Sequence, residues 1–305
     1  HLYGMRTHKH PQTVAATLLQ QGDGRHVHRK TQTHFINNLK NMKVSVIGAG
    51  AMGGAIAQGL LKGEFAKNSD ITIADPSQKV IDQFAETGAS ITTDNNIAAE
   101  SSDIVNVVVK PWLVQPVLEG IKSSLNYKKQ ILVVVAAGVT SEQIKEWLKK
   151  DGEDMIPFFL VIPNIAIALL NSMTFIVPAN ASAENTQLIK ELYGSMGEVI
   201  ITDEKHLAAG TTLASCGIAY AMRYVRAASE GGVEIGFKAD DAKAIVLQTV
   251  KGAVELLQAT GKHPEAMIDQ VTTPSGVTIR GLNEMEHAGF TSAVIRGLKA
   301  GLSSK

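Results

Sequence analysis

The stretch Lys43–Gly53 reads KVSVIGAGAMG and decides the fold of the N-terminal half. Val44, Val46 and Ile47 form a short apolar run that predicts a buried strand, and an amphipathic stretch that predicts a helix follows the glycine cluster. The residues Gly48-Ala49-Gly50-Ala51-Met52-Gly53 match the pattern G-x-G-x-x-G at this turn. The three glycines permit a tight bend, a close approach of backbone to a diphosphate, and packing of the helix on the strand. The stretch therefore predicts a dinucleotide-binding loop at a helix N-terminus, with an ordinary glycine turn as the alternative.

Short apolar runs alternate with helical stretches after this turn. Helical spacing occurs at Lys79–Glu86 and Gln115–Ser123, and the strand-like runs are Ile71–Ala74, Ile91–Thr92, Ile104–Val109 and Ile131–Val135. Strands that alternate with helices predict right-handed crossovers and a mostly parallel sheet. Two later runs, Met173–Val177 and Val199–Thr202, flank a helical segment at Ala183–Met196, and we expect them to add edge strands. The N-terminal part is therefore predicted to be an α/β domain of Rossmann type.

The pattern changes after about Asp203. The segment Leu207–Leu257 has long alanine-rich helical spacing without strand-like runs. Its many small residues permit close helix packing and suggest helices that meet a partner subunit. We expect a tail at residues 1–41, the dinucleotide-binding domain at residues 42–203 and an all-helical domain at residues 204–305.

The tail differs in composition from the rest of the chain. It lacks a sustained apolar period, and it carries six of the nine histidines, namely His1, His8, His10, His26, His28 and His34. Paired histidines could form a metal site, but a metal site needs ligands held in fixed geometry and this segment supplies no scaffold. We therefore expect no metal site, and we interpret the tail as disordered or as an added extension, with a natural start at Met42.

The overall composition limits the classes of function. With 45% hydrophobic and 19% charged residues, the chain has the balance of an ordinary globular protein. Lys plus Arg and Asp plus Glu both number 29, so no global field recruits nucleic acid or an anionic membrane. No apolar run approaches the roughly 20 residues that span a bilayer, and the single cysteine, Cys216, cannot form an internal disulfide. We expect a cytoplasmic protein without nucleic-acid or membrane partners.

Further candidate cofactor contacts follow the predicted strands. Asp75 stands after the second strand, at about the 20-residue spacing expected for a carboxylate that binds ribose hydroxyls. Such a carboxylate repels a 2′-phosphate and favours NADH, whereas Ser77 and Lys79 could soften that preference, and an ordinary Asp-Pro turn is the alternative. The loops Val108–Pro111 and Ala136–Gly138 end the fourth and fifth strands, where ligands bind in such sheets. Lys110 would contact the cofactor there or lie in solvent.

The segment Asp269–Gly281 reads DQVTTPSGVTIRG and interrupts the helical part. Small hydroxyl residues and glycine, from Thr272 to Gly276, precede a helical restart at Val277. A turn that opens a helix forms a nest of backbone N–H groups suited to a carboxylate, and Thr278 would direct its hydroxyl into the same pocket. The alternative is a plain helix–helix connection with threonine capping.

These motifs, taken together, resemble one family. The order is I-G-A-G-x-M-G, V-K-P, A-A-G-V-T, the pair His263-Pro264 and V-T-T-P-S-G-V-T-I. From about Lys43 to Ala300 the chain resembles the pyrroline-5-carboxylate reductases. The resemblance implies a Rossmann domain, then a helical domain for dimerisation and substrate binding, often assembled into a decamer of five dimers. It also implies NADPH or NADH as the cofactor and 1-pyrroline-5-carboxylate as the small-molecule substrate, reduced to L-proline in the last step of proline biosynthesis.

The resemblance also implies the site residues. Thr278 would hydrogen-bond the imine nitrogen, within a substrate loop of Thr273, Pro274, Ser275, Gly276, Val277 and Thr278. The implied cofactor contacts are Ile47, Gly48, Ala49, Gly50, Ala51, Met52, Gly53, Asp75, Asn95, Val108, Val109, Lys110, Pro111, Val135, Ala136 and Ala137.

Two stretches depart from the family pattern. The usual R-x-M/I-P-N-T reads Leu160-Val161-Ile162-Pro163-Asn164-Ile165, so an arginine and a threonine are replaced by apolar residues. Where many members have S-G-S-G-P-A-Y, this chain has Ala214–Tyr220, and we interpret Cys216 there as a packing residue rather than a nucleophile. Three alternatives follow: another NAD(P)H-dependent imine reductase, an enzyme like the 3-hydroxyacid dehydrogenases, or a non-catalytic dinucleotide-binding protein. The dehydrogenases rely on a helical lysine, and the Thr272–Thr278 turn has none.

Overall fold

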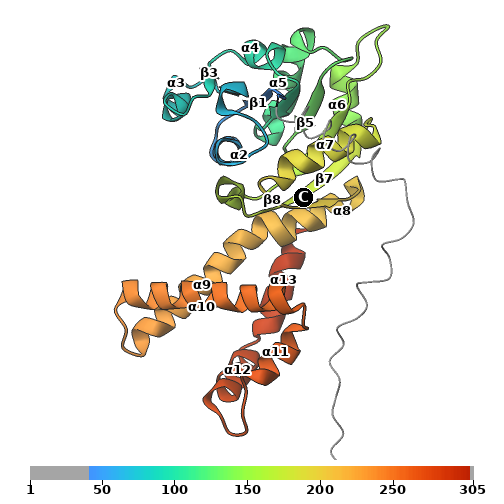
Figure 1. The fold of residues 1–305 in the computed structure, drawn as a ribbon. Helices are drawn as coiled ribbons and strands as arrows, with labels where there is room; N and C mark the ends of the chain where they lie inside the picture. Colours follow the sequence, from blue (N-terminus) through green and yellow to red (C-terminus); the bar gives the residue numbers. More distant parts are fainter. Residues whose placement is uncertain (1–40, 303–305) are drawn as a thin grey trace, which may run out of the picture. The chain divides into compact units, whose positions relative to one another are not determined.

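The computed structural model describes residues 41–302 and places the strand of the opening stretch inside an eight-stranded sheet (Figure 1). The strand order is β3-β2-β1-β4-β5-β6-β7-β8; β1 to β6 are parallel, β7 is antiparallel to β6, and β8 is parallel to β7. The strands are β1 (Val44–Ile47), β2 (Ile71–Ala74), β3 (Ser90–Thr92), β4 (Ile104–Val107), β5 (Ile131–Val134), β6 (Phe158–Ile162), β7 (Ser172–Ala179) and β8 (Gly197–Ile201). The predicted fold class, a mostly parallel Rossmann-type sheet followed by helices, is confirmed.

Two strand predictions need correction. The sequence analysis missed β6, a buried apolar run that a second apolar stretch, the 3-10 turn Ile165–Leu169, follows closely. Such a stretch cannot be told from a buried helix by its period alone. Met173–Val177 was expected at an edge, but β7 lies between β6 and β8, so of the two later runs only β8 is an edge strand. The position of β7 was wrong because β6 was missed: β6 pairs with β5 on one side and with β7 on the other.

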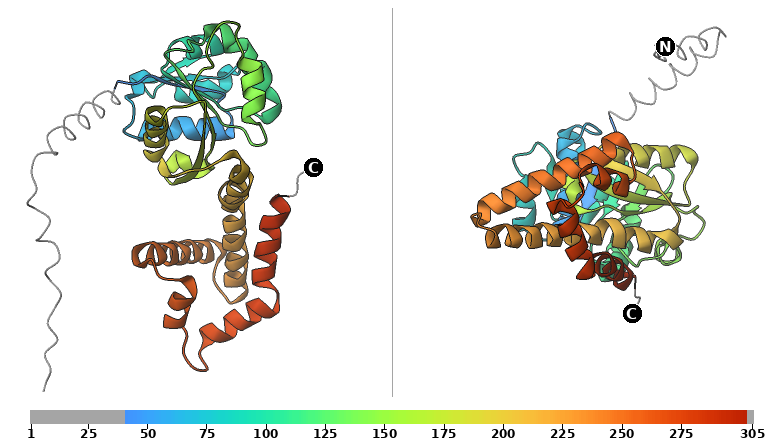
Figure 2. Two further views of the ribbon diagram at one scale, coloured as in Figure 1. Left: turned by 90° about the vertical axis from the view of Figure 1, so that its right-hand side faces the viewer. Right: turned by 90° about the horizontal axis from the view of Figure 1, so that it is seen from below.

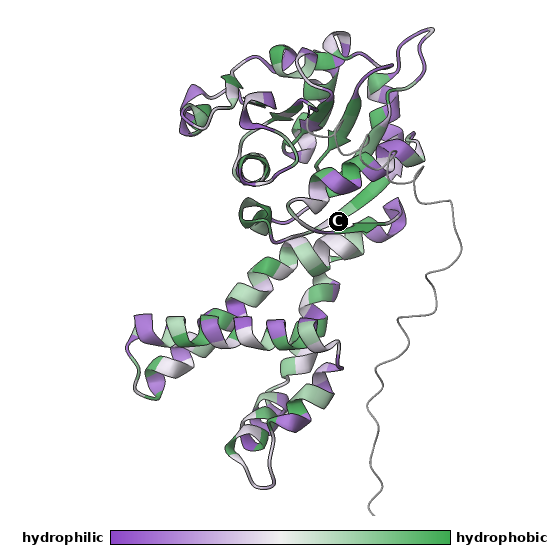
Figure 3. Ribbon diagram, in the orientation of Figure 1, coloured by the Kyte–Doolittle hydropathy of each residue, from purple (hydrophilic) through white to green (hydrophobic). Residues whose placement is uncertain are grey.

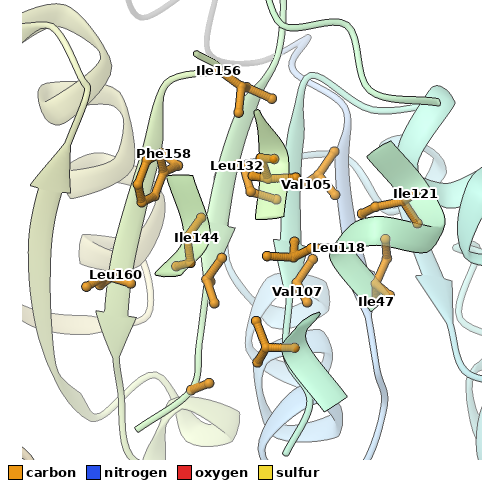
Figure 4. Close-up of a cluster of buried hydrophobic side chains, with 14 of the residues drawn as sticks. Ile47, Val105, Val107, Leu118, Ile121, Leu132, Ile144, Ile156, Phe158 and Leu160 are labelled. Carbon is orange, nitrogen blue, oxygen red and sulfur yellow. The ribbon is translucent and has the colours of Figure 1, made fainter. Parts of the chain in front are cut away.

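Helices cover both faces of the sheet. The helices of this part are α2 (Ala51–Lys62), α3 (Gln78–Ile81), α4 (Asn95–Glu100), α5 (Pro111–Ile121), α6 (Ser141–Leu148) and α7 (Ala183–Gly194), with 3-10 turns at Asn68–Asp70, Asp82–Phe84, Lys122–Ser124 and Ile165–Leu169. The helices α4, α5 and α6 share one buried apolar cluster with the sheet (Figure 4). The cluster contains Val107 of β4 and Leu132 of β5 together with Leu118 of α5 and Ile144 of α6. Burying such side chains removes them from water and stabilises the sheet.

The opposite face carries a buried polar chain. Asn106 alternates with Val105 and Val107 along β4, so its side chain points away from the α4–α6 face. Tyr193 of α7 donates its hydroxyl to Asn106 Oδ1 at 2.8 Å, and Asn106 Nδ2 donates to the carbonyl of Ser45 at 2.9 Å. Burial raises the pKa of Tyr193 well above its usual value, so the folded state keeps the phenol neutral. This contribution to stability is present below the pKa of unfolded tyrosine, about 10, and falls as the pH rises above it.

The second part of the chain is entirely helical. Its helices are α8 (Glu204–Gly210), a π-helical turn at Thr211–Cys216, α9 (Gly217–Glu234), α10 (Ala239–Thr260), α11 (Pro264–Gln270), α12 (Val277–His287) and α13 (Phe290–Gly301). The helices α9 and α10 pack against each other (Figure 2), and Tyr224 of α9 meets Phe290 of α13 edge to face with ring centres 6.5 Å apart. Even so, no residue of α11, α12 or α13 is buried.

Hydrophobic residues recur along these helices (Figure 3), and many of their large apolar side chains are exposed. They include Met222 and Val233 on α9, Leu247 and Leu256 on α10, and Ile295 on α13. An apolar surface of this extent marks an interaction site in a folded protein. In the described part of the chain, no helix combines the length and hydropathy that crossing a membrane requires. The histidine-rich tail prediction concerns residues that lie almost wholly outside the described range.

We predict that Tyr193→Phe lowers the free energy of unfolding by about 1–3 kcal/mol, because Asn106 Oδ1 would be left buried without a donor. Ser123→Ala is the control, since Ser123 is exposed in the sheet-containing part and its hydroxyl makes no hydrogen bond within residues 41–302; its effect should stay within about 0.5 kcal/mol. Urea denaturation at one fixed protein concentration measures both. Equal midpoints for the two variants would show that the buried chain is dispensable.

Candidate active site

The predicted cofactor segments form one row at the carboxyl ends of five parallel strands. Backbone hydrogen bonds continue the sheet from segment to segment: Asp75 N–H to the carbonyl of Thr92, Gly48 N–H to Ala74, Val108 N–H to Ile47, and Val135 N–H to Val107, at 2.8–3.2 Å. The strand order reverses between β1 and β4, and ligands of such sheets bind outside the strand ends at this point. The structure therefore brings together four loops and the start of α4 that the sequence separates.

The glycine loop is packed as its pattern requires. Gly48 has φ +97°, and a Cβ on it would lie 2.2 Å from the carbonyl oxygen of Val108. A Cβ on Gly53 would lie 1.8 Å from the carbonyl oxygen of Gly48. Gly50 differs, because a Cβ there would meet nothing within 4 Å. The first and third glycines thus serve packing, whereas the second borders open space.

This open space suits a diphosphate. Helix α2 begins after Gly50 without a capping side chain and without an acidic residue in its first turn. Its first intrahelical bond runs from Gly54 N–H to the carbonyl of Gly50, so the N–H groups of Ala51, Met52 and Gly53 precede the helical ladder. Such N–H groups and the positive end of the helix dipole bind phosphates. The residues present therefore fit the diphosphate of a dinucleotide cofactor.

Asp75 has a structural partner that the sequence did not indicate. Its Oδ2 accepts from the N–H of Ala49 at 2.9 Å, and its Oδ1 accepts from the N–H of Ser77 at 2.9 Å. The carboxylate thereby ties the end of β2 to the glycine loop. Each oxygen keeps a further lone pair and could still accept a hydrogen bond from a ribose hydroxyl. The contact with the ribose stays a prediction.

The remaining segments of the row have distinct settings. Asn95 is the first residue of α4, and its Oδ1 is buried without a hydrogen-bond partner. Lys110 is exposed and immediately precedes α5, where Pro111 takes the first helical position, at which proline needs no N–H partner. Val135 and Ala136 are buried, and Ala137 is exposed beside Gly138, which has φ +77°. Small exposed backbone at this loop can approach a flat ring.

The predicted substrate loop opens helix α12. Gly276 precedes the helix with extended backbone, and α12 has neither a capping side chain nor an acid in its first turn. A Cβ on Gly276 would lie 2.6 Å from Thr273 Oγ1, so the turn is closely packed there. Ser275 has φ +60°, a left-handed conformation that a side chain rarely adopts. The hydroxyl-bearing residues Thr273, Ser275 and Thr278 are exposed.

The hydrogen bonds of the Asp269–Gly281 segment are local. Thr272 Oγ1 donates to the carbonyl of Asp269 at 3.2 Å, and Gly276 N–H donates to the carbonyl of Thr273 at 2.9 Å. Within residues 41–302, no hydrogen bond joins this segment to the row of strand ends. The same residues contain no group of three or more side chains placed to hold a metal ion.

The comparisons with known proteins agree with this geometry. Residues 43–138 match a family model described as NADP oxidoreductase, coenzyme F420-dependent, and residues 204–304 match one described as pyrroline-5-carboxylate reductase dimerisation. Pyrroline-5-carboxylate reductase 2 of Dictyostelium discoideum is 36% identical over 278 residues, which cover 86% of this chain and 91% of that protein. The chain belongs to the pyrroline-5-carboxylate reductase family.

Other members of the family support the assignment. Reductase 1 of D. discoideum is 38% identical over 84% of this chain, although the match covers 48% of that longer protein. The solved reductase of Coxiella burnetii has a TM-score of 0.77 at 25% identity and covers 86% of this chain and 96% of its own. The reductase of Plasmodium falciparum, solved with NADP bound, shares the fold with a TM-score of 0.77 at 24% identity, over 87% of this chain and 97% of its own. The match at residues 204–304 accords with the exposed apolar helices and identifies this region with self-association.

The departures from the reductase pattern have structural explanations. Leu160, in place of arginine, is only 1% exposed inside the apolar cluster of β6, so an apolar residue suits its surroundings. Ile165, in place of threonine, is exposed at the start of a 3-10 turn. Between them in sequence, Asn164 is buried; it caps that turn by accepting from Ala166 N–H at 3.1 Å and donates to the carbonyl of Ala214 in the π-helical turn at 3.4 Å. Cys216 ends the same turn and is half-buried.

The sequence analysis also missed a pair of hydrogen bonds between the sheet-containing part and the helical part. Glu204, the first residue of α8, accepts from the N–H of Ser141 at 2.8 Å and from its hydroxyl at 2.6 Å. Ser141 begins α6, just beyond the Val135–Gly138 loop of the candidate site. Sequence gives no signal for this bond, because the residues are 63 positions apart and each fits the first turn of its own helix.

We predict that Gly50→Ala weakens binding of NADPH and NADH by more than about tenfold, since a methyl group would occupy the space where backbone approaches a diphosphate. Its cost in folding stability should stay below about 1 kcal/mol, because the site is open and φ is negative. Gly53→Ala is the comparison: its Cβ has no room, so it should lower the melting temperature instead. Thermal denaturation and cofactor fluorescence titration separate the two effects. Undiminished cofactor binding by Gly50→Ala contradicts the proposed diphosphate position.

Proposed function

We propose that the chain catalyses the reduction of 1-pyrroline-5-carboxylate to L-proline with NADPH or NADH, the last step of proline biosynthesis. One observation carries the proposal: in a chain of this family, the glycine loop at α2 and the Thr272–Thr278 turn at α12 are both helix N-termini without capping side chains or acidic residues in the first turn. The first suits a diphosphate, and the second suits a carboxylate. The substrate and the cofactor each carry one of these anions.

The roles of the residues follow from these positions. The Gly48–Gly53 loop binds the diphosphate, and Asp75 and Asn95 face the ribose and adenine half. The loops Val108–Pro111 and Val135–Ala137 border the nicotinamide half, because they follow β4 and β5 on the other side of the crossover point. In the second segment, the N–H groups at the start of α12 bind the substrate carboxylate, and Thr278 orients the imine nitrogen.

The reaction makes modest demands on the side chains. Reduced nicotinamide supplies a hydride to the carbon of the C=N bond, and the nitrogen carries a proton when the imine is protonated. A protonated imine is already a good electrophile, so the chain must chiefly hold donor and acceptor in near-attack geometry and exclude water. An alcohol is a poor acid at neutral pH, and Thr278 therefore acts by orienting the nitrogen.

The catalytic unit is proposed to be a homodimer. The hydrogen bonds of the substrate loop are local, and the helices around it expose apolar side chains that a second copy would cover. The substrate loop of one chain would then meet the strand ends of the other. We further propose that five dimers assemble into a decamer, as the family resemblance implies. We also propose a cytoplasmic location, which the single cysteine suggests. Light scattering after gel filtration measures the assembly.

A spectrophotometric assay of cofactor oxidation tests the proposed activity. The full-length protein is assayed with pyrroline-5-carboxylate, other cyclic imines and 3-hydroxy acids, each with NADPH and with NADH (or the oxidised forms for the hydroxy acids). The proposal expects rapid oxidation with pyrroline-5-carboxylate. Turnover with another imine alone would indicate a different imine reductase, and turnover with hydroxy acids alone would indicate an enzyme like the 3-hydroxyacid dehydrogenases. Cofactor binding without turnover would indicate a non-catalytic dinucleotide-binding protein.

We predict that Thr278→Ala lowers kcat by about ten- to a hundredfold, because the imine nitrogen loses its hydrogen-bond partner in the transition state. The melting temperature should hardly change, since Thr278 is exposed in the single chain. Thr278→Ser keeps the hydroxyl and should retain most of the activity. Steady-state kinetics with both variants measures the effect. If Thr278→Ala and Thr278→Ser reduce the imine equally fast, Thr278 does not orient the nitrogen.

Asp75→Asn tests the source of cofactor preference. The asparagine oxygen can still accept from the N–H of Ala49, but the negative charge near the ribose is lost. We expect affinity for NADPH to rise by about five- to tenfold, as removal of one repulsive charge at short range predicts, while affinity for NADH changes less. Titration with both cofactors measures the ratio. A ratio that stays constant would show that Asp75 serves only to hold the glycine loop.

A further inference from the structure

A hollow of about 420 Å³ lies between α4 and α5. One wall is polar and consists of Thr93, Asp94, Asn95 and Asn96, at the start of α4; the apolar wall includes Leu113 and Val117 of α5. Helix α4 packs against β1 and β2, and α5 begins at the end of β4. Both helices begin at the edge of the sheet that carries the glycine loop, and the hollow extends from there along α5 as far as Ile121.

Trp112 is 73% exposed and directly precedes Leu113, which lines this hollow. It is the second residue of α5, directly after the Lys110-Pro111 pair, and its neighbours Leu113 and Pro116 line the hollow. Residues four apart on a helix lie on the same face, which places Trp112 beside Pro116. Within residues 41–302, the Trp112 side chain makes no aromatic pair, no cation–π contact and no hydrogen bond. A large flat apolar ring left in water at a site edge is a ready stacking surface.

Asn95 supplies an independent observation in the polar wall. Its Oδ1 is buried and accepts no hydrogen bond, whereas Asn96 beside it accepts from the Ser124 hydroxyl at 2.7 Å. An unsatisfied buried acceptor costs free energy. Rotation of the Asn95 side chain toward the hollow would let its oxygen accept from an N–H or O–H donor of a ligand. After that rotation the hollow would have a hydrogen-bond acceptor on one wall and an apolar surface on the other.

We propose that Trp112 is a cofactor-positioning residue whose indole ring stacks on the adenine of NADPH or NADH, with Asn95 on the other side of the hollow. The inference rests on the proposed dinucleotide site. The diphosphate lies at the β1/β4 crossover and the nicotinamide half extends toward β5, so the adenine half extends the other way, toward β2 and β3. An adenine is flat, and its exocyclic amine is a donor, which matches both walls.

Tryptophan fluorescence tests the proposal directly, because the chain has two tryptophans, Trp112 and Trp147. Trp147 is only partly exposed and packs against the apolar cluster. Trp147→Phe leaves Trp112 as the sole tryptophan, and Trp112→Phe leaves Trp147. The probes are NADPH, ADP, which has adenine without nicotinamide, and reduced nicotinamide mononucleotide, which has nicotinamide without adenine. We expect ADP to quench the fluorescence of Trp147→Phe and to leave that of Trp112→Phe unchanged.

Trp112→Ala supplies the affinity measurement. Loss of one base–aromatic stack should weaken ADP and NADPH by about tenfold, and the affinity for reduced nicotinamide mononucleotide should not change. Equal ADP affinity with and without Trp112, together with unquenched Trp112, overturns the inference. So does a Trp112→Ala variant that changes the mass of the assembly while binding ADP normally, since Trp112 would then be a contact between subunits. If the unaltered protein binds neither NADPH nor NADH, the proposed function fails first.

Discussion

The close approach of helix α2 to strand β1 is the constraint on which the candidate site depends. The first turn of α2 lies so near the strand-to-helix bend that a single methyl group on Gly53 would overlap the carbonyl oxygen of Gly48. Gly48 in turn lies against the backbone of Val108. This packing fixes the position and direction of the helix N-terminus relative to the sheet. The N–H groups of Ala51 and Met52 then point to one place without help from any charged side chain.

The same reliance on backbone extends along the row of strand ends. Each cofactor segment is held by a hydrogen bond that continues the sheet, and the strands that carry these segments have a largely apolar interior on both faces. Close-packed protein interiors deform little. The replacement of arginine by Leu160 therefore changes a packing position in β6 and leaves the loops that border the site in place. A site defined by backbone tolerates side-chain change that would disable a site built from charged groups.

The parts of the fold that were predictable are those with a local signal. Lys43–Gly53 combines an apolar run, a glycine pattern and a helical period, and the structure has the strand, turn and helix in that order. The apolar run of β6 is followed closely by a second apolar stretch and was missed, and its absence put β7 at the wrong place in the sheet. The bonds of Glu204 to Ser141 and of Tyr193 to Asn106 join residues 63 and 87 positions apart. No local pattern encodes such pairs, because each residue is unremarkable in its own element.

The helical part shows why the proposed substrate half of the site would be tied to association. Its helices α11, α12 and α13 bury no residue within one chain, and α10 buries only Ala242. An isolated chain would expose large apolar side chains along α10, α12 and α13, so the free energy that orders these helices must come largely from contact with another copy. The turn at Gly276 holds its shape only as firmly as α11 and α12 on either side of it. The shape of the proposed carboxylate-binding turn therefore depends on assembly, whereas the glycine loop is ordered by the sheet of its own chain.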